Sequence, residues 1–215
     1  MNFTFKTLLV ATGLVFGAAA QASVITFETA SSTDGPQASA SDYRDVVNAA
    51  MALPGAQSAV VGLFDNLSNQ IVFGGSNQNI AYRSTVVFGA ASSGTWDLRA
   101  GVDFGRGGAA FLDGVALDFK STDMWWAGSY ADASQSFQLN GLALSAGTHT
   151  LQLFGLEGCC DGWQQGQYSF NGSSFKTFAT DDGMTAAAVP EPETYALMLG
   201  GLGAVALLAR RRKMN

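Results

Sequence analysis

The stretch TWDLRAGVDFGRGGAAFLDGVALDF, residues 95–119, decides the fold class because its apolar residues recur at every second position. The apolar side of its first half consists of Trp96, Leu98, Ala100, Val102 and Phe104. Such alternation is the pattern of a half-buried β-strand. In the second half, two short apolar runs flank Asp113-Gly114. An Asp-Gly pair between two apolar runs is a strong signal for a hairpin turn, so two further strands are predicted here.

Similar patterns continue toward the C-terminus. SFQLNGLALS, residues 136–145, repeats the scheme with Asn140-Gly141 and predicts a second hairpin. GTHTLQLFGLE (147–157) and GQYSFNGSSFKTF (166–178) are two more strand-like runs. Short strands at regular spacing are typical of an antiparallel β-sandwich or jelly roll, which we place at residues 85–180.

The segment before this block, residues 23–84, has a different pattern of apolar residues. Residues 41–55, SDYRDVVNAAMALPG, carry apolar side chains at helical spacing and end in Pro54-Gly55, so a helix is predicted. Residues 58–69, SAVVGLFDNLSN, suggest a second short helix. The expected fold is therefore mainly β, with one or two short N-terminal helices packed on the sandwich.

The N-terminus has the features of a secretory signal peptide at residues 1–22. The single cation Lys6 is followed by an apolar run that ends at Ala20. Ala20-Gln21-Ala22 supplies small residues at the two positions that signal peptidase reads. We expect cleavage after Ala22 by signal peptidase, and export of the chain.

The C-terminus, VPEPETYALMLGGLGAVALLARRRK at residues 189–213, combines a proline-rich turn, an apolar run and a basic cluster. As a helix, residues 195–209 would be about 22 Å long, short of a hydrocarbon core of about 30 Å. The basic side chains at 210–213 can snorkel to the interface and hold that end in the cytoplasm. A single transmembrane helix is predicted, with the body of the protein outside. Pro190 and Pro192 would keep Glu191 extended and open to a protease.

This tail resembles the PEP-CTERM sorting signal of Gram-negative bacteria that make exopolysaccharide. The resemblance rests on the order of three features, namely Pro190-Glu191-Pro192, the apolar helix, and Arg210, Arg211, Arg212. It implies an exosortase-type protease as partner, an inner-membrane precursor, and a final location at the cell surface or outside the cell. Residues 190–213 form the signal and 181–189 a linker; a permanent membrane anchor is the alternative.

The net charge of residues 23–189 limits the classes of partner that the protein can bind. Residues 23–189 contain 15 acidic and 6 basic residues, a formal net charge of −9. Such a surface repels nucleic acid and anionic membranes, so no nucleic-acid partner is expected. It is compatible with calcium and neutral sugars, and equally with the need of an extracellular protein to stay soluble.

Cys159 and Cys160 are the two cysteines of the chain, and export favours a disulfide between them. Adjacent Cα atoms joined by a trans peptide lie about 3.8 Å apart, below the usual disulfide span, so such a bridge requires a distorted turn. Three roles stand open: a stiff element beside a ligand pocket with Trp163, a structural staple, or thiol or metal chemistry. Cys159-Cys160-Asp161-Gly162 resembles the Cys-Cys-x-Gly motif that marks one group of PEP-CTERM proteins.

The candidate ligand-binding residues are aromatic and acidic. Trp125-Trp126 lies in STDMWWAGSYAD, residues 121–132. On a strand the two rings face opposite sides, one in the core and one in solvent, whereas in a loop both can stack on sugar rings. Asp103 and Asp161 are the best candidates for a cation or sugar contact. The candidate site comprises Trp125, Trp126, Asp103, Asp161 and Trp163.

Residues 100–119 and 144–158 resemble, more distantly, the carbohydrate-binding β-sandwich of the protective-antigen type. The resemblance implies a sugar-binding fold, in whose lectin members two neighbouring aspartates bind calcium. Here Val102-Asp103 stands at the matching place, so one aspartate of the pair is missing. Calcium is the one cofactor that the resemblance suggests.

The sequence offers no convincing catalytic constellation. His149 is the one histidine, and no G-x-S-x-G elbow frames a serine nucleophile. The D-x-D-x-D-G calcium loop is also absent from the sequence. We therefore expect a non-enzymatic, exported surface or matrix protein that binds exopolysaccharide. The alternatives are a secreted carbohydrate-active hydrolase and a purely structural matrix protein without a defined ligand.

Overall fold

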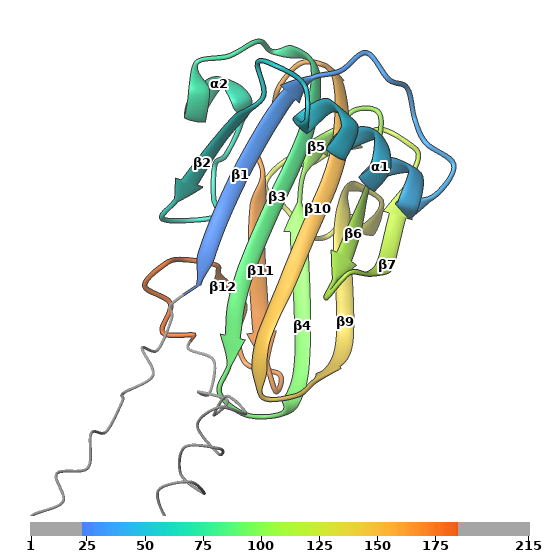
Figure 1. Ribbon diagram of the computed structural model, residues 1–215. Helices are drawn as coiled ribbons and strands as arrows, with labels where there is room; N and C mark the ends of the chain where they lie inside the picture. The colour runs from blue at the N-terminus through green and yellow to red at the C-terminus, as the bar shows by residue number, and fades with distance from the viewer. Residues whose placement is uncertain (1–22, 185–215) are drawn as a thin grey trace, which may run out of the picture.

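The computed structural model describes residues 23–184 and consists mainly of antiparallel strands in two facing sheets (Figure 1). The larger sheet has six strands in the spatial order β2-β1-β3-β10-β6-β7: β1 Val24–Ser31, β2 Gln57–Val61, β3 Gln78–Ala90, β6 Gly108–Leu112, β7 Val115–Lys120 and β10 Gly147–Cys159. The smaller sheet has four in the order β12-β11-β4-β9: β4 Gly94–Gly101, β9 Ser136–Leu144, β11 Gln165–Phe170 and β12 Lys176–Thr177. A separate ribbon pairs β5, Asp103–Phe104, with β8, Met124–Trp125.

The main core lies between the two sheets. It is formed by inward-facing aliphatic and aromatic side chains from both layers, among them Phe27, Tyr82, Val86, Phe88, Leu98, Phe137 and Leu153. All five alternating apolar residues from Trp96 to Phe104 are buried, which confirms the predicted inward side. The run is divided between two strands, because β4 ends at Gly101 and β5 belongs to the separate ribbon. Burial of these side chains stabilises the fold because apolar surface leaves water.

A second, smaller core lies on the outer face of the larger sheet, under α1, Ala40–Met51 (Figure 1). The helix begins after Ser39, whose side chain accepts a hydrogen bond from the Asp42 N–H at 3.2 Å and so caps the first turn. Tyr43 and Val47 are fully buried against the sheet, which confirms the predicted helical face. Tyr43 Oη also donates to the Arg106 carbonyl at 2.7 Å, which ties the helix to the loop after β5.

The hairpin predicted at Asp113-Gly114 is confirmed, because β6 and β7 pair on either side of it. Asp113 has φ of 51° and Gly114 has φ of 79°, the left-handed backbone that a two-residue turn requires.

Two local predictions are wrong. Residues 57–61 form the edge strand β2 rather than a helix, and the second helix, α2, is confined to Asn69–Phe73. A short apolar run does not distinguish strand from helix by periodicity, and here pairing with β1 decides. At Asn140-Gly141 the chain does not reverse. Instead β9 runs through with an irregularity opposite β4, and the Gly141 N–H donates to Asp97 Oδ1 at 2.7 Å.

The segment 23–84 is also more than a helical addition to the sandwich. It supplies β1, β2 and the first half of β3, which are three neighbouring strands of the larger sheet. The strands of the sandwich therefore begin at Val24 and not near residue 85. The two-sheet body starts at the first described residues.

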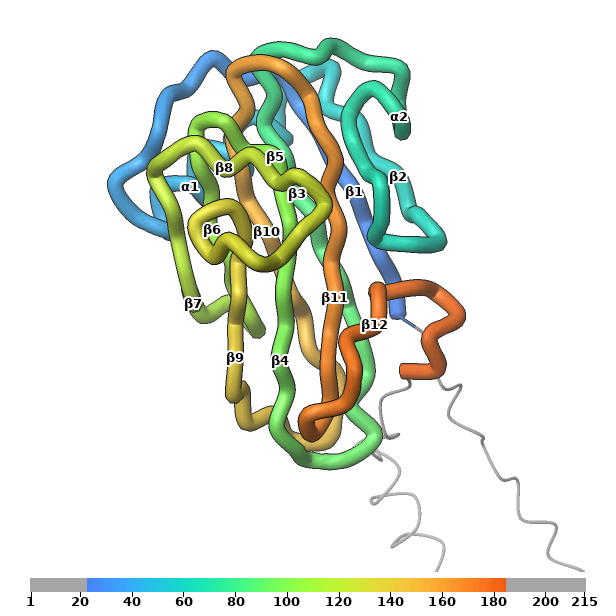
Figure 2. The backbone as a smooth tube through the Cα atoms, turned by 180° about the vertical axis from the view of Figure 1, so that it is seen from behind, coloured from blue at the N-terminus to red at the C-terminus, as the bar shows by residue number. Residues whose placement is uncertain are grey.

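The described chain begins and ends at the same end of the molecule, and the β10–β11 connection lies at the other (Figure 2). Val24 pairs with Val87 near the end of β3, and Met184 lines a hollow with Gly89 from the same strand end. In residues 23–184, no helix combines the length and apolar character needed to cross a membrane. The predicted signal peptide, the transmembrane helix at 195–209 and the Pro190–Pro192 motif lie outside the described residues.

Candidate functional site

The β5–β8 ribbon places an exposed tryptophan beside a buried aspartate. Asp103 pairs with Trp125, and Phe104 pairs with Met124. Phe104 and Met124 are fully buried, which fixes the ribbon to the core. The Trp125 residue is 67% exposed, whereas Asp103 is 6% exposed. Because directly opposed residues share a face, the two side chains leave the ribbon on the same side.

Trp126, one of the ligand candidates from the sequence, is a core residue in the structure. It is 7% exposed and its ring lies 5.4 Å from the ring of Tyr130. It also covers Gly101, where a Cβ atom would lie only 2.1 Å from the indole. Of the two neighbouring tryptophans, Trp125 alone is accessible to a ligand, which agrees with the opposite facing of successive strand residues.

A surface hollow of about 470 Å³ opens beside Trp125. Its lining combines the indole with polar and small residues, namely Asp123, Ala127, Ser129, Ala131, Asp132 and Gln135. The backbone N–H of Trp125 donates to Gln135 Oε1, and Asp132 Oδ1 accepts from the backbone N–H of Ser134 at 2.8 Å. Hydrogen bonds from Ser134 lower the pKa of Asp132. The hollow therefore has one aromatic wall and carboxylate and amide groups held in place.

The loop between β10 and β11 brings a second exposed tryptophan to Asp103. A disulfide joins Cys159 to Cys160, and the peptide bond between them is cis. Three residues later, Trp163 is 59% exposed. Between them, Gly162 packs directly on Asp103, since a Cβ at this glycine would lie 2.1 Å from Asp103 Oδ2. The segments that carry Trp125 and Trp163 thus meet at Asp103.

Asp103 lies in an environment that favours its protonated form. Burial is the main cause, and the nearby charges of Glu157, Asp123 and Asp161 add to it. A hydrogen bond from the Gly162 N–H opposes the shift, and the net effect raises the pKa of Asp103 to about 7. With this pKa, a large fraction of the Asp103 carboxyl groups is protonated at neutral pH.

Glu157 is a second buried carboxylate, which the sequence analysis did not single out. It is 1% exposed and Oε2 accepts from the Gly105 N–H at 2.5 Å. Burial raises its pKa. Among the described residues, Oε1 has no hydrogen-bond partner. Its burial could have been predicted from the sequence. Glu157 is an even number of residues from the inward-facing Leu151 and Leu153 of β10, so its side chain points to the same side of the strand.

Asp161 is occupied by structural hydrogen bonds. Oδ1 accepts from the Asn69 N–H at 3.2 Å and from the Tyr82 hydroxyl, and Oδ2 accepts from the Gln70 N–H at 2.6 Å. The carboxylate therefore ties α2 and β3 to the loop that contains the disulfide. This arrangement leaves Asp161 as an anchor of the site rather than an open ligand group.

The residues at this end do not fit the calcium site that the resemblance suggested. Calcium takes six to eight oxygen ligands. Val102, at the place of the second aspartate, is fully buried in the core, and the oxygens of Asp161 already accept three hydrogen bonds. In the described range 23–184, no three His, Cys, Asp or Glu side chains are grouped so that they could hold a metal ion.

His149 has a structural environment. Nδ1 donates to Asp113 Oδ2 at 2.7 Å and Nε2 donates to the Ser145 carbonyl at 2.9 Å. Burial lowers its pKa, but the hydrogen bonds with Asp113 and Ser145 and the charge of Asp113 outweigh burial, so the pKa is raised. Both ring nitrogens are used as donors, and the imidazole links β10 to the β6–β7 turn.

The comparison of the sequence with known families bears on the cellular location of the protein. Residues 188–213 match the PEP-CTERM protein-sorting motif. The motif indicates an exported protein that is sorted to the cell surface, and it implies an exosortase-type processing partner. The match covers the sorting residues Pro190, Glu191 and Pro192 and the basic cluster. No curated protein matches the chain in sequence.

Several solved structures are similar to the chain at low sequence identity. A PA14 sugar-binding domain from an RTX adhesin is 10% identical, with a TM-score of 0.49 over 79% of this chain and 100% of that one. The PA14 domain of the antifreeze protein MpAFP is 11% identical, with a TM-score of 0.49 over 82% and 96%. The epithelial adhesin 6 A domain from Candida glabrata, in complex with Galb1-3GlcNAc, is 10% identical, with a TM-score of 0.43 over 80% and 95%.

Proposed function

We propose that this protein is sorted to the cell surface through its C-terminal motif and that its folded domain binds exopolysaccharide there. The observation that carries the proposal is the pair of exposed indoles, Trp125 and Trp163, on two segments that meet at Asp103. Large aromatic side chains left in solvent on rigid segments are typical of binding surfaces. We call Trp125, Trp163 and the hollow beside Trp125 the aromatic surface.

The chemistry of the aromatic surface suits a sugar polymer. The flat face of an indole can pack against the C–H groups of a sugar ring, while fixed polar groups bind its hydroxyls. Asp123, Asp132 and Gln135 supply such acceptors and donors around Trp125. The formal charge of −9 over residues 23–189 favours a neutral polymer over an acidic one.

Binding can be tested by affinity gel electrophoresis against exopolysaccharide purified from the producing cells and by glycan arrays. We expect Trp125→Ala and Trp163→Ala each to weaken binding about 5- to 30-fold, the range for loss of an aromatic contact. Phe119→Ala is a matched control, because Phe119 is an exposed aromatic residue on β7 that does not line the hollow beside Trp125. Equal binding by all three variants would contradict the proposal, and no binding by the unsubstituted protein would favour a purely structural matrix role.

A secreted hydrolase is the second candidate, and one observation favours it. Asp103 and Glu157 are neighbouring carboxylates with raised pKa values, a feature of general acids. Both are almost completely buried, however, which gives a substrate little access to their oxygens. Release of reducing sugar from the exopolysaccharide, abolished by Asp103→Asn, would support hydrolysis over binding.

A further inference from the structure

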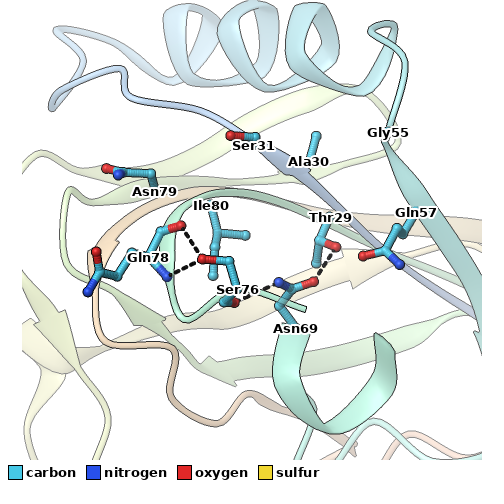
Figure 3. Close-up of a pocket in the computed structure, with 10 residues that line it drawn as sticks. All are labelled: Thr29, Ala30, Ser31, Gly55, Gln57, Asn69, Ser76, Gln78, Asn79 and Ile80. Carbon is cyan, nitrogen blue, oxygen red and sulfur yellow. Dashed lines mark hydrogen bonds between the residues drawn. The ribbon is translucent and has the colours of Figure 1, made fainter. Parts of the chain in front are cut away.

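A second hollow of about 390 Å³ lies on the larger sheet, between β1, β3 and α2 (Figure 3). It shares no lining residue with the hollow beside Trp125, and it borders the loop that contains the disulfide. Gln78 of this hollow pairs with Cys159, and the Asp161 N–H donates to the Asn77 carbonyl at 3.0 Å. The volume falls within the range of about 300–1,000 Å³ typical of small-molecule sites.

We propose that this hollow binds a neutral, polyhydroxylated ligand of the size of a mono- or disaccharide. We call it the amide pocket, because four residues with amide side chains line it together with Thr29 and Ile80, namely Gln57, Asn69, Gln78 and Asn79. No charged side chain is among its lining residues. Amides donate and accept hydrogen bonds, as sugar hydroxyls do, so the two chemistries are complementary. The proposal does not depend on binding at the aromatic surface.

Asn69 is held in one orientation before any ligand arrives. Its Oδ1 accepts from the Thr29 hydroxyl at 2.6 Å, and its Nδ2 donates to the Ser76 carbonyl at 2.7 Å (Figure 3). Gly75 packs so closely that a Cβ there would lie 2.4 Å from Nδ2. Asn69 keeps one N–H and one oxygen lone pair unused. Fixing a polar group in advance lowers the entropic cost of binding.

The side-chain amides of Gln57 and Gln78 retain their full hydrogen-bonding capacity. Within residues 23–184, the side chains of Gln57 and Gln78 form no hydrogen bond with the protein, and both residues are exposed. The buried side chain of Ile80 also lines the pocket. The pocket thus offers unused polar groups next to an apolar contact, which matches the alternating hydroxyl and C–H surface of a sugar.

The charged groups next to the amide pocket are hydrogen-bonded to neutral groups of the protein. The carboxylate of Asp161 accepts its three hydrogen bonds from α2 and Tyr82. Arg106 donates to Asn79 Oδ1 at 2.8 Å and to the Asp34 carbonyl at 3.1 Å. Because no charged side chain lines the pocket, a charged ligand would lose hydration against neutral amides, whereas a neutral ligand would not carry that cost.

The test is an NMR titration of the ¹⁵N-labelled full-length protein with maltose, cellobiose and lactose, and with digalacturonate as the charged counterpart. We expect at least one neutral disaccharide to shift the side-chain amide signals of Gln57, Asn69 and Gln78, and digalacturonate to leave them unchanged. Gln57→Ala should weaken that binding about 5-fold, the effect of one hydrogen bond. Gln70→Ala, an exposed glutamine of α2 outside the pocket lining, should leave it unchanged.

Two further variants separate the amide pocket from the aromatic surface and from folding. Gly75→Ala should displace Asn69 and weaken binding, with a thermal melt to verify that the protein is folded. Trp125→Ala should leave the amide shifts intact. Amide signals that stay still with every neutral disaccharide, that respond equally to digalacturonate, or that lose their response in Trp125→Ala would each overturn the proposal.

Discussion

Gly162 and Asp103 approach so closely that only a residue without a side chain fits at position 162. This contact is where the segments carrying Trp125 and Trp163 meet, so the geometry of the aromatic surface depends on one glycine. The buried carboxylate beside it has a pKa near neutrality because burial and the charges of Glu157, Asp123 and Asp161 disfavour its ionisation. Steric fit and protonation at single residues thus set the shape of the proposed site.

Gly162→Ala should destabilise the protein by about 1–3 kcal/mol, the usual cost of forcing an extra carbon into a packed position. It should also weaken polysaccharide binding, since either Asp103 or the loop must move. Urea unfolding measures the first effect and affinity electrophoresis the second. Gly35→Ala is the matched control, because a Cβ at Gly35 meets nothing within 4 Å. Equal effects of the two substitutions would refute this account.

Asp103→Asn should change how stability depends on pH. A carboxyl whose pKa rises from 3.8 to about 7 on folding stabilises the folded state fully below 3.8. This contribution is lost as the pH rises through about 7. The free energy of unfolding of Asp103→Asn, relative to the unsubstituted protein, should therefore increase between about pH 4 and 7, by up to a few kcal/mol. Urea titrations across that range would show parallel pH profiles if the inference is wrong.

At the scale of elements, the turn between β6 and β7 is fastened to β10 by one aspartate. Asp113 Oδ1 accepts from the Thr150 N–H at 2.8 Å, and Oδ2 accepts from His149 Nδ1 at 2.7 Å. The tight β6–β7 hairpin could be predicted from its Asp-Gly pair, but its attachment to a strand more than thirty residues away could not. The β6–β7 turn is therefore attached to β10 by two hydrogen bonds, one of which becomes an ion pair when His149 is protonated.

His149→Gln should remove a stabilising contribution that is present only at lower pH. The folded-state pKa of His149 is raised above 6.5, so its ion pair contributes fully below 6.5 and is lost as the pH rises through the raised value. We expect a loss of about 1 kcal/mol at pH 5.5, since Asp113 is partly exposed, and a smaller loss at pH 9. Thermal melts at the two pH values measure the difference, and a loss that grows with pH would contradict it.

At the scale of the whole molecule, the described chain starts and ends at one end, and the disulfide loop lies at the other (Figure 2). A domain that leaves toward a C-terminal sorting motif from one end can present its opposite end to the surroundings. The formal charge of −9 over residues 23–189 leads us to expect weak attraction to anionic membranes and nucleic acid. Sorting through the C-terminal motif is therefore compatible with ligand binding at the opposite end of the domain.

The intact mass of the protein recovered from the cell surface should lack residues 1–22 and the segment after the Pro190–Pro192 motif. It should also be lighter by the two thiol hydrogens, because Cys159 and Cys160 are joined. Mass spectrometry with and without reduction measures all three changes. Replacing Arg210, Arg211 and Arg212 with alanine should leave the C-terminal segment in place. Recovery of the full chain from the cytosol would contradict export.

The sequence by itself determined the class of the fold and the sorting of the protein. Alternation from Trp96 to Phe104, the Asp113-Gly114 turn and the C-terminal motif are local patterns, and near neighbours in the chain are enough to impose them. The helix over 40–51 could be predicted for the same reason. Local patterns failed at β2 and at Asn140-Gly141, where pairing with a distant strand selected one of two locally acceptable structures.

Only the tertiary structure decided which candidate residues are accessible. From the sequence, Trp125 and Trp126 were equal candidates for ligand contact. In the structure Trp126 packs over Gly101 and against Tyr130, and Trp125 remains in solvent. Asp161 was used to anchor α2, and the contact between Gly162 and Asp103 joined segments that are far apart in the chain. Exposure and convergence depend on how the two sheets pack, which is a property of the whole chain and not of any one stretch.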